Sequence, residues 1–258
     1  MDLHLKNKVA LITGGSRGIG KCIADCFAAE GADLGICARD SEVLNQAVTD
    51  LQKHGTTVIG IPTDVTESGA TEAFVNGAVK QLGRLDALVC NVGGREGEGL
   101  EDSTDEDWMR TFDLNLFHAV RASRASIPHF RKSGGGSITI ISSISGWKPA
   151  PSRAQYGATK AAEMFLAGAF AWELGEIGVR VNTVCPGSTM FEGGAWDRFR
   201  NDNPEGYERF ADREFPTKRL GTPEEIADAT VFLASDRASW VNGASIPVDG
   251  AQGRPNAF

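Results

Sequence analysis

Short apolar runs alternate with longer amphipathic segments along most of the chain. The runs that have the length of buried strands are residues 9–13, 32–38, 57–62, 87–91, 137–142, 180–185 and 245–248. Apolar residues recur with the period of a helix near residues 21–30, 41–54, 67–82, 105–131, 156–174 and 222–234. Strands that alternate with helices predict crossover connections and a parallel sheet with helices on both faces. The pattern therefore predicts an α/β fold built on a Rossmann-type doubly wound parallel sheet.

The length and composition of the chain allow one large core. The chain has 258 residues, 41% of them hydrophobic, and contains no repeat, linker or low-complexity tract. α/β chains of this length often form a single domain. We therefore expect one domain over residues 1–258.

The charge of the chain is acidic, and basic residues do not gather anywhere along it. The formal net charge is −8, the sequence pI is about 5.1, and no Lys/Arg cluster occurs. Nucleic acid and anionic membranes are therefore not expected as partners. The longest apolar runs are strand-sized, and the first residues enter a strand without the apolar core of a signal peptide. We therefore expect a cytoplasmic protein.

The cysteine pattern bears on redox state and on metal binding. The five cysteines are Cys22, Cys26, Cys37, Cys90 and Cys185. An odd, scattered set favours reduced, buried thiols over a disulfide framework. Cys22 and Cys26 share a helix face, but the four histidines form no ligand cluster with them, so no metal site is expected.

A glycine-rich turn follows the first expected strand. Residues 13–20 read TGGSRGIG and lead directly into a helical segment. Glycine at Gly14, Gly18 and Gly20 lets the backbone approach a pyrophosphate, and the helix N-terminus aims its N–H groups at the anion. No Lys-Ser or Lys-Thr follows the last glycine, which argues against a triphosphate-binding P-loop. The turn therefore predicts a dinucleotide site, with a simple strand-to-helix turn as the alternative.

The end of the second expected strand bears on cofactor choice. It reads Cys37-Ala38-Arg39, with no acidic residue at the strand tip. An acid there accepts from a free ribose 2′-hydroxyl, whereas an arginine accommodates a 2′-phosphate. Arg17 in the glycine turn can add a second guanidinium to the same phosphate. The pattern favours NADP(H) over NAD(H), although Asp40 keeps open the alternatives that Arg39 is a solvated surface charge and that NAD(H) binds.

A tyrosine and a lysine stand four residues apart at the start of the helical segment 156–174. Tyr156 and Lys160 then lie on the same helix face, where the ammonium favours the phenolate form of the phenol. Ser143 follows the strand 137–142, and its hydroxyl can hold the oxygen of a carbonyl or an alcohol. Three such groups around one oxygen make an acid/base site.

Polar residues follow two other expected strands and interrupt one helix. Asp64, just past the third strand, can accept from an adenine amino group or cap the next helix. Asn91 and Gly93 end the fourth strand, where short residues let a ring lie against the backbone. Asn115 is a poor helix former between two leucines. If it is buried, its amide must be hydrogen-bonded, either as a structural bridge or as an anchor for a catalytic water.

Taken in order, these motifs resemble the classical short-chain dehydrogenase/reductase family over nearly the whole chain. TGGSRGIG resembles its glycine motif, CNVG at 90–93 its NNAG element, and CPG the turn on the nicotinamide side. The family's catalytic tetrad corresponds to Asn115, Ser143, Tyr156 and Lys160. Ser143 stands thirteen residues before Tyr156, as the family's serine does. RLGTPEEIA and VNGASIPVDG resemble the family's C-terminal core.

The resemblance implies hydride transfer with a nicotinamide cofactor. Tyr156 would exchange the proton of the substrate oxygen, and Ser143 would fix that oxygen. Lys160 would activate the tyrosine and hold the nicotinamide ribose, while Asn115 would support a proton-relay water. The candidate cofactor contacts are Gly14, Ser16, Arg17, Gly18, Ile19, Gly20, Arg39, Asp64, Val65, Asn91, Gly93, Tyr156, Lys160, Pro186, Gly187 and Thr189.

The resemblance also implies an organisation of the chain. Cofactor-binding elements would lie mainly in 8–120, the catalytic stretch in 136–187 and a substrate lid in 188–219. The family is commonly tetrameric, and the nearly all-apolar helix 161–174 agrees with a homotetramer. Two positions depart from the family pattern: Cys90 replaces the first Asn of NNAG, and Phe191 stands where a threonine is common.

The segment 190–219 is the least regular part of the chain. It is rich in aromatic residues and in charges of both signs, as a substrate lid or a surface subdomain would be. Its arginines Arg198, Arg200, Arg209 and Arg213 invite an acidic substrate, but seven Asp and Glu in the segment favour solvated ion pairs.

A pocket for a partly apolar substrate of modest size is expected next to the acid/base site. Its lining should come from Trp147, from residues 94–99 and from residues 191–215. A fold that serves many functions does not name the substrate.

Together these features predict an NADP(H)-preferring oxidoreductase that interconverts a ketone and a secondary alcohol. Within the enzyme class, the alternative is an NAD-linked dehydrogenase of a polyol, sugar or steroid. From another class, the alternative is a non-catalytic dinucleotide-binding sensor or scaffold. The presence of all four tetrad residues argues against a scaffold, which has no need of an acid/base tyrosine.

Overall fold

Seven parallel strands form one sheet in the computed structural model, which describes residues 1–254. The strands are β1 Val9–Thr13, β2 Asp33–Ala38, β3 Val58–Pro62, β4 Ala87–Cys90, β5 Gly136–Ile141, β6 Val179–Pro186 and β7 Ser245–Val248. Their order across the sheet is β3-β2-β1-β4-β5-β6-β7. The chain therefore builds outward from β1 in one direction and then from β4 in the other. In such sheets, ligands bind outside the carboxyl ends of the strands at this switch point.

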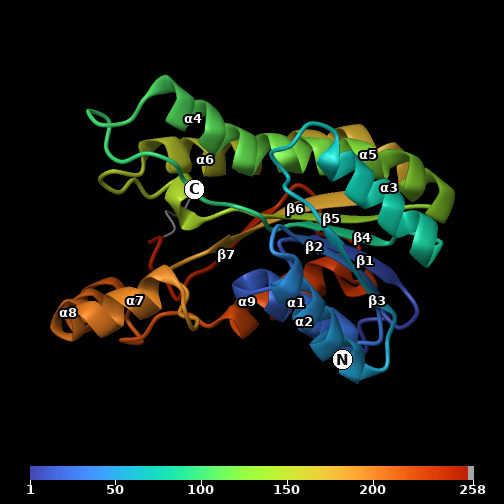
Figure 1. Ribbon diagram of the computed structural model, residues 1–258, viewed down its shortest axis with the longest axis horizontal. Coiled ribbons are helices and arrows are strands. Elements are labelled where there is room, and N and C mark those ends of the chain that lie inside the picture. The colour runs from blue at the N-terminus through green and yellow to red at the C-terminus, as the bar shows by residue number, and fades with distance from the viewer. Residues whose placement is uncertain (255–258) are drawn as a thin grey trace.

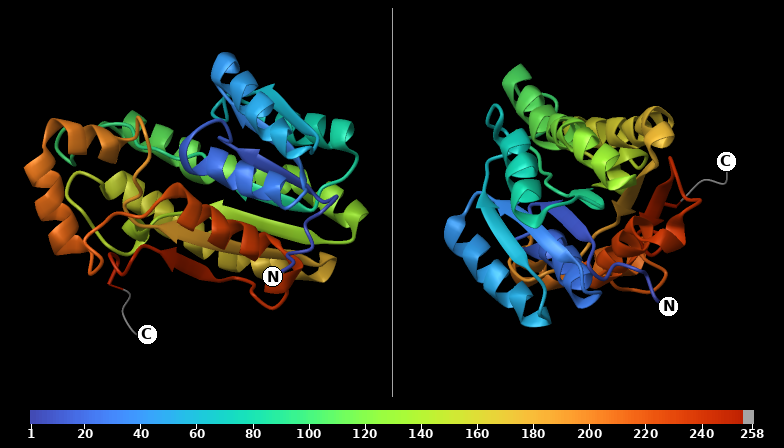
Figure 2. Two further views of the ribbon diagram at one scale, coloured as in Figure 1. Left: turned by 90° about the horizontal axis from the view of Figure 1, so that it is seen from below. Right: turned by 90° about the vertical axis from the view of Figure 1, so that its right-hand side faces the viewer.

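Helices cover both faces of the sheet (Figure 1). The helices of one face are α1 Gly18–Ala29, α2 Ser41–Leu51 and α9 Pro223–Ala234. The helices of the other face are α3 Ala70–Leu82, α4 Asp105–Phe112, α5 His118–Ser133 and α6 Ala154–Leu174. The end-on view of Figure 2 shows the sheet between these two layers. The predicted doubly wound α/β fold is confirmed.

The two faces of the sheet bury separate apolar clusters. Along β1, Ala10 and Ile12 pack into the cluster under α1, α2 and α9, whereas Val9 and Leu11 pack into the cluster under α3, α5 and α6. Successive residues of a strand point to opposite faces, so a strand that is covered on both sides is apolar throughout. This is why the strands read as continuous apolar runs.

The expected long helix over 105–131 is divided by a π-helical turn. α4 ends at Phe112, the turn spans Asp113–Phe117, and α5 begins at His118. Turns of this kind inside helices often occur at functional sites. This one contains the buried Asn115.

The segment 190–219 is more regular than its composition suggests. It contains α7 Ala195–Asp202 and α8 Pro204–Glu214, which lie beyond the end of the sheet, apart from the two helix layers (Figure 1). The Asn203 side chain accepts from the backbone N–H of Gly206 at 2.9 Å, and Pro204 takes the first position of α8. A cap followed by proline begins the helix, and Tyr207, Phe210 and Ala211 give α8 an apolar face among its charges.

Neither a membrane-spanning helix nor a metal-ligand cluster occurs among residues 1–254. No helix of this part is both long and apolar enough to cross a bilayer. No group of three or more His, Cys, Asp or Glu side chains there is placed to hold a metal ion. The five cysteines are free thiols, three of them buried in the core and two half-buried on α1.

Candidate active site

The glycine turn between β1 and α1 packs tightly against its own backbone. Gly14 and Gly18 have φ angles of 68° and 54°, in the left-handed region that favours glycine. A Cβ on Gly20 would collide with the Gly14 carbonyl oxygen. The first turn of α1 therefore lies close to β1, with its free N–H groups at the carboxyl edge of the sheet.

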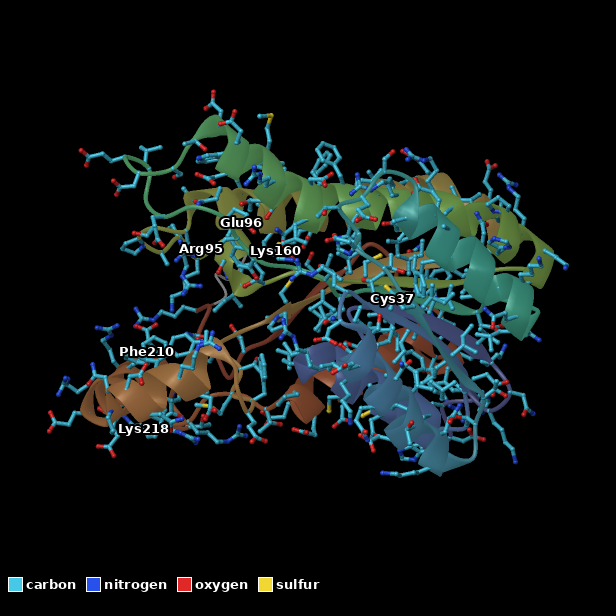
Figure 3. All side chains as sticks on the ribbon, in the orientation of Figure 1. Cys37, Arg95, Glu96, Lys160, Phe210 and Lys218 are labelled. Carbon is cyan, nitrogen blue, oxygen red and sulfur yellow. The ribbon has the colours of Figure 1, made fainter. Side chains whose placement is uncertain are left out.

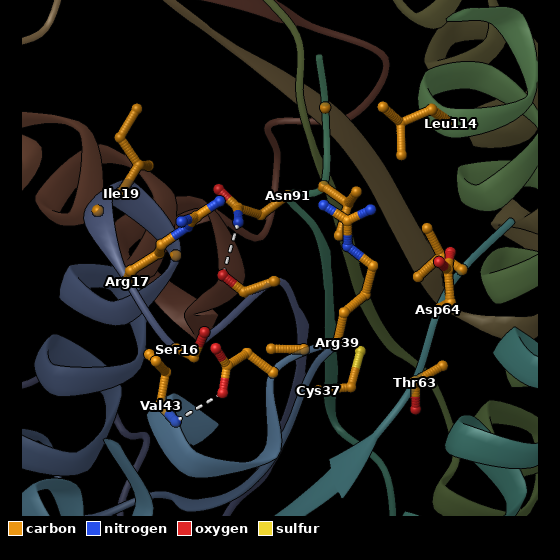
Figure 4. A pocket seen from close by; sticks show the side chains of 18 of the residues that line it. Ser16, Arg17, Ile19, Cys37, Arg39, Val43, Thr63, Asp64, Asn91 and Leu114 are labelled. Atoms are coloured by element: carbon orange, nitrogen blue, oxygen red, sulfur yellow. Dashed lines mark hydrogen bonds between the residues drawn. The ribbon is translucent and has the colours of Figure 1, made fainter. Parts of the chain in front are cut away.

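A cavity of about 550 Å³, here called the dinucleotide cavity, opens beside this turn (Figure 4). The predicted cofactor contacts that line it are Gly14, Ser16, Arg17, Gly18, Ile19, Gly20, Arg39, Asp64, Val65, Asn91 and Gly93. Its volume lies in the usual range for small-molecule and cofactor sites. The residues present therefore fit a nicotinamide dinucleotide, with the glycine turn placed to receive the pyrophosphate.

Both arginines predicted to bind a 2′-phosphate reach the dinucleotide cavity. Arg17 and Arg39 are solvent-exposed, and Figure 4 shows them with Ser16 and Asp64 around the cavity. Asp40 lines the same cavity, but no ion pair joins it to either arginine within residues 1–254; its Oδ1 caps α2 by accepting from the backbone N–H groups of Glu42 and Val43, at 3.0 and 3.1 Å. The guanidinium groups are thus open to an anion.

Asp64 lies on the wall of the dinucleotide cavity and does not cap a helix. The hydroxyl of Thr66 donates to its carboxylate at 2.7 Å, and the backbone N–H of Thr66 does so at 2.9 Å. These bonds, with a smaller contribution from Arg39, hold the pKa of Asp64 below its ordinary value. α3 begins only at Ala70, after Gly69. The carboxylate is therefore ionised at the cavity wall, where it can accept from a ligand.

Asn91 joins the end of β4 to the glycine turn. Its amide nitrogen donates to the carbonyl groups of Thr13 and Gly14, at 3.0 and 3.2 Å. The Thr13 hydroxyl in turn accepts from the backbone N–H of Asn91 at 2.9 Å. Asn91 therefore fixes the floor of the dinucleotide cavity as well as lining it.

Two further cavities continue from the dinucleotide cavity toward α7 and α8. The central cavity, of about 240 Å³, shares Ile19, Asn91, Gly93 and Phe191 with the dinucleotide cavity. The lid cavity, of about 480 Å³, shares Ser143, Tyr156, Gly187 and Trp196 with the central cavity. The other predicted residues that line the central cavity are Lys160, Pro186 and Thr189. Tyr156 and Ser143 therefore stand where a cofactor site and a substrate site meet.

The geometry agrees with the choice of Ser143 among three neighbouring serines. The buried Ser142 hydroxyl donates to the Lys160 carbonyl at 2.8 Å and so ties β5 to α6. The Ser143 hydroxyl oxygen accepts from the backbone N–H of Ser145 at 3.1 Å, which leaves its O–H free to donate. Ser143 lines both the central and the lid cavity, whereas Ser145 lines only the lid cavity.

Lys160 is buried between α6 and the sheet (Figure 3) and is held by a carboxylate. Its Nζ donates to the Ile141 carbonyl at 3.0 Å and lies 3.0 Å from each carboxylate oxygen of Glu163. Nζ also lies 5.5 Å from the centroid of the Tyr156 ring. Burial by itself lowers the pKa of Lys160, but the charges of Glu163 and Tyr156 outweigh it and raise that pKa. The lysine is therefore a cation beside the tyrosine.

Glu163 is a site residue that the sequence analysis missed. Its side chain is 1% exposed, and burial raises the pKa of Glu163 while the Lys160 ammonium opposes the rise. In the sequence it only interrupts an apolar helix. The signal was its spacing, because an acid three residues after a lysine on a buried helix face needs that lysine as its partner.

Asn115 acts as a bridge between the π-helical turn and the loop after β4. Its amide nitrogen donates to the carbonyl groups of Thr111 and Gly94, both at 2.7 Å, and its Oδ1 accepts from the Gly94 N–H at 3.2 Å. The side chain is buried and lines none of the three cavities. Of the two roles expected for this amide, the structural bridge is present.

Phe191, a position that departs from the family pattern, lies against the glycine turn. A Cβ on Gly18 would be 3.1 Å from its ring. Phe191 lines both the dinucleotide and the central cavity, while the Thr189 hydroxyl donates to the Gly187 carbonyl at 3.2 Å. The first residues of the segment 188–219 therefore form part of the wall of the cofactor site.

Trp147 and the loop 94–99 do not line the lid cavity, contrary to expectation. The Trp147 indole N–H donates to the Gly253 carbonyl at 3.3 Å, which directs the ring toward the C-terminal segment. The loop 94–99 packs on the start of α6, where the Gln155 amide donates to the Glu96 carbonyl at 2.9 Å. The side chains that line the lid cavity instead include Lys148, Pro149, Pro151, Arg153, Trp196, Phe210, Arg213 and Glu214.

The fold and these linked cavities are those of a dinucleotide-dependent enzyme of the Rossmann type. A family model described as enoyl-(acyl carrier protein) reductase matches residues 14–251. A Bacillus subtilis (strain 168) protein described as the uncharacterized oxidoreductase YvrD is 37% identical over 97% of this chain and 98% of its own. These matches place the chain in the short-chain dehydrogenase/reductase family of oxidoreductases, as its motifs predicted.

Solved structures of the family are similar over almost their full length. L-sorbose reductase from Gluconobacter frateurii, complexed with NADPH and L-sorbose, is 35% identical with a TM-score of 0.94, over 99% of this chain and 100% of that one. A 7α-hydroxysteroid dehydrogenase complexed with NADH and 7-oxo glycochenodeoxycholic acid is 32% identical with a TM-score of 0.89, over 96% and 95%. These neighbours support a nicotinamide dinucleotide as cofactor without fixing which one.

Proposed function

We propose that this protein is an NADP(H)-preferring oxidoreductase that interconverts a ketone and a secondary alcohol. The observation that carries the proposal is the position of Tyr156 and Ser143. Both residues line the central cavity, which adjoins the dinucleotide cavity, and both also line the lid cavity. An NAD-linked dehydrogenase of a polyol, sugar or steroid is the alternative within the family. Of the two structural neighbours, the L-sorbose reductase is complexed with NADPH and the 7α-hydroxysteroid dehydrogenase with NADH, so the neighbours are compatible with either cofactor.

In the proposed reaction the nicotinamide ring would supply or accept the hydride at the substrate carbon. The residues of this chain would handle the oxygen. Tyr156 would give its phenolic proton to the oxygen during reduction and take it back during oxidation, and Ser143 would donate a hydrogen bond to the same oxygen. Lys160 would stabilise the phenolate that forms, and Asn115 would hold the loop that borders the lysine.

The preference for NADP(H) rests on Arg17 and Arg39. Both reach the dinucleotide cavity, and the tip of β2 itself carries no acid, whereas Asp40, two residues further on, caps α2 with its Oδ1. A planar guanidinium binds phosphate oxygens through two parallel hydrogen bonds. The proposed preference follows from this pair of open cations.

The test measures NADPH and NADH oxidation against a panel of ketones, 3-oxoacyl thioesters, sugars and quinones. We expect NADPH to be preferred and Arg39→Ala to lower the NADPH-to-NADH ratio of kcat/KM by about tenfold to a hundredfold, the value of a charge-assisted hydrogen bond. Arg124→Ala, on the exposed side of α5, should leave the ratio unchanged. An unchanged ratio in Arg39→Ala would refute the assignment of Arg39. Cofactor binding without turnover on any substrate would favour a non-catalytic sensor.

We also propose that the protein works as a homotetramer in the cytoplasm. Exposed aromatic side chains support the assembly: Phe165 and Trp172 on α6 are 82% and 90% exposed, and Trp240 is 99% exposed. Phe165 and Trp172 are seven residues apart and so lie on one helix face. Apolar surface of this kind marks an interaction site. The free thiols fit a reducing compartment.

A further inference from the structure

The lid cavity combines an apolar wall with an unusual set of charges. Its apolar wall is provided by Trp196 of α7 and Phe210 of α8, whose rings stack with their centroids 4.5 Å apart. Four charged side chains also line it: Lys148, Arg153, Arg213 and Glu214. Tyr156 and Ser143 line the same cavity, so the charges and the proposed reaction centre face one ligand space.

The charges of the lid cavity do not cancel. Among residues 1–254, Glu214 is the one acidic residue that lines it; the Lys148 ammonium donates to its carboxylate at 2.6 Å and the Arg213 Nε–H does so at 3.0 Å. The bond from Lys148, ahead of that from Arg213, holds the pKa of Glu214 below its usual value, so this carboxylate is ionised. Three cations against one anion leave an excess of two positive charges around the cavity.

Arg153 supplies charge that no acid compensates. No hydrogen bond or ion pair of its guanidinium occurs within residues 1–254, and the side chain is exposed at the cavity. It is the N-cap residue of α6, three residues before Tyr156, and both residues line the lid cavity. Arg213 uses only its Nε–H in the bond to Glu214 within the described chain, which leaves its terminal N–H groups for a ligand.

The other arginines of the segment 188–219 have different partners. Arg200 pairs with Asp197 at 2.7 Å and Arg209 with Glu205 at 3.4 Å, as the sequence interpretation of solvated ion pairs predicted. Neither of these two arginines lines the lid cavity. The positive charge of the cavity is therefore a local feature of Arg153, Arg213 and Lys148.

We propose that the lid cavity binds an anionic group, a carboxylate or a phosphate, on the carbonyl substrate. Arginine recognises both through its planar fork of N–H donors. The aromatic rings of Trp196 and Phe210 cover the apolar part of such a substrate, and its carbonyl oxygen lies at Tyr156 and Ser143. This inference rests on the proposed function and adds the class of substrate: a carbonyl compound with an apolar segment and an anionic end.

The first test compares matched substrates that differ only in charge. A keto acid and its methyl ester, and a keto phosphate and its dephosphorylated form, are reduced by the wild type, Arg153→Ala and Arg213→Ala. We expect the wild type to favour the anionic member by about tenfold or more in kcat/KM, mainly through KM, and each variant to lower that ratio by about tenfold. Arg209→Ala, on the same helix as Arg213 but outside the cavity, should keep the wild-type ratio. A wild type that treats both members alike overturns the proposal.

A second test does not depend on turnover. Binding of 4-phenylbutyrate, phenylphosphonate and neutral 4-phenylbutyramide is measured by calorimetry in the presence of NADPH. We expect one of the anions to bind at least about tenfold more tightly than the amide, and Arg153→Ala to remove the difference. Equal binding of anion and amide refutes the anion site, even when neutral ketones are reduced. Tight anion binding in a protein that reduces no carbonyl compound supports the site and refutes the proposed function instead.

Discussion

The charge of Lys160 depends on one carboxylate. Both oxygens of Glu163 lie 3.0 Å from Nζ, and both side chains are buried. Removal of one partner from a buried ion pair leaves the other charge uncompensated, at a cost of about 3–5 kcal/mol. The pKa of Lys160 is raised only because charged neighbours outweigh the effect of burial, which lowers it. Glu163 therefore preserves the cation that the proposed acid/base tyrosine requires.

Glu163→Gln keeps the size of the side chain and removes its charge. The raised pKa of Lys160 keeps the wild-type cation intact to high pH. In the variant that pKa falls, so we expect activity to be lost at a lower alkaline pH than in the wild type. The measurement is the rate of alcohol oxidation across the alkaline range. Glu173→Gln, on the exposed side of α6, is the matched control; identical alkaline limbs in both variants would contradict this role of Glu163.

At the scale of elements, the π-helical turn between α4 and α5 positions the loop after β4. Two hydrogen bonds between Asn115 and Gly94 join them, and a third runs to the Thr111 carbonyl in α4, so that both N–H donors of the amide are used. A Cβ on Gly93 would lie 2.9 Å from the Asn115 Oδ1 and 3.2 Å from the Lys160 Nζ. Glycine at 93 thus lets the loop pass close to both groups. The turn therefore supports the wall of the site without lining a cavity itself.

Asn115→Ala should destabilise the fold as well as reduce activity. The substitution leaves the buried Thr111 carbonyl and the half-buried Gly94 carbonyl and N–H without this partner. A fully buried unmatched group costs about 1–3 kcal/mol, and one that water can reach costs less. We expect the free energy of unfolding in urea to fall by roughly 2–4 kcal/mol. Asn201→Ala, at an exposed position of α7, should change it by less than about 0.5 kcal/mol. A similarly small effect of Asn115→Ala would show that the bridge is not structural.

Some elements of the fold were predictable from the sequence pattern and others were not. The strands were predictable because a sheet covered on both faces demands unbroken apolar runs, as β1 shows. α8 has a recognisable start in Asn203-Pro204, which was overlooked among mixed charges. The direction of Trp147 depends on Gly253, far along the chain, and the charge of the lid cavity depends on how loops and lid helices meet. Local patterns carry no information about such distant contacts.

For the molecule as a whole, the exposed aromatic residues support the proposed contact with other copies. Phe165 and Trp172 lie on the outer side of α6, whose inner side provides Lys160 and packs on the sheet. An interface on this helix would restrict the helix that carries Tyr156 and Lys160. Assembly and the order of the proposed catalytic centre are then linked through one element.

Trp172→Glu should weaken that assembly. A charge at the centre of an apolar contact must be desolvated without a partner, which costs several kcal/mol. We expect light scattering after size exclusion to give a tetramer for the wild type and a smaller species for the variant. Glu176→Gln, in the exposed turn after α6, serves as the control. A wild type that is already monomeric would refute the proposed tetramer.

The most direct test of the account is a single-turnover reduction with NADPH that carries deuterium at both positions of C4 of the nicotinamide ring. The substrate is the best ketone found in the panel, and wild type is compared with Tyr156→Phe. We expect the wild-type alcohol to carry one deuterium at the carbinol carbon, and the variant to bind NADPH yet react about a hundredfold more slowly or worse. An alcohol without deuterium, or a variant that keeps the wild-type rate, would contradict hydride transfer with Tyr156 as the acid/base group.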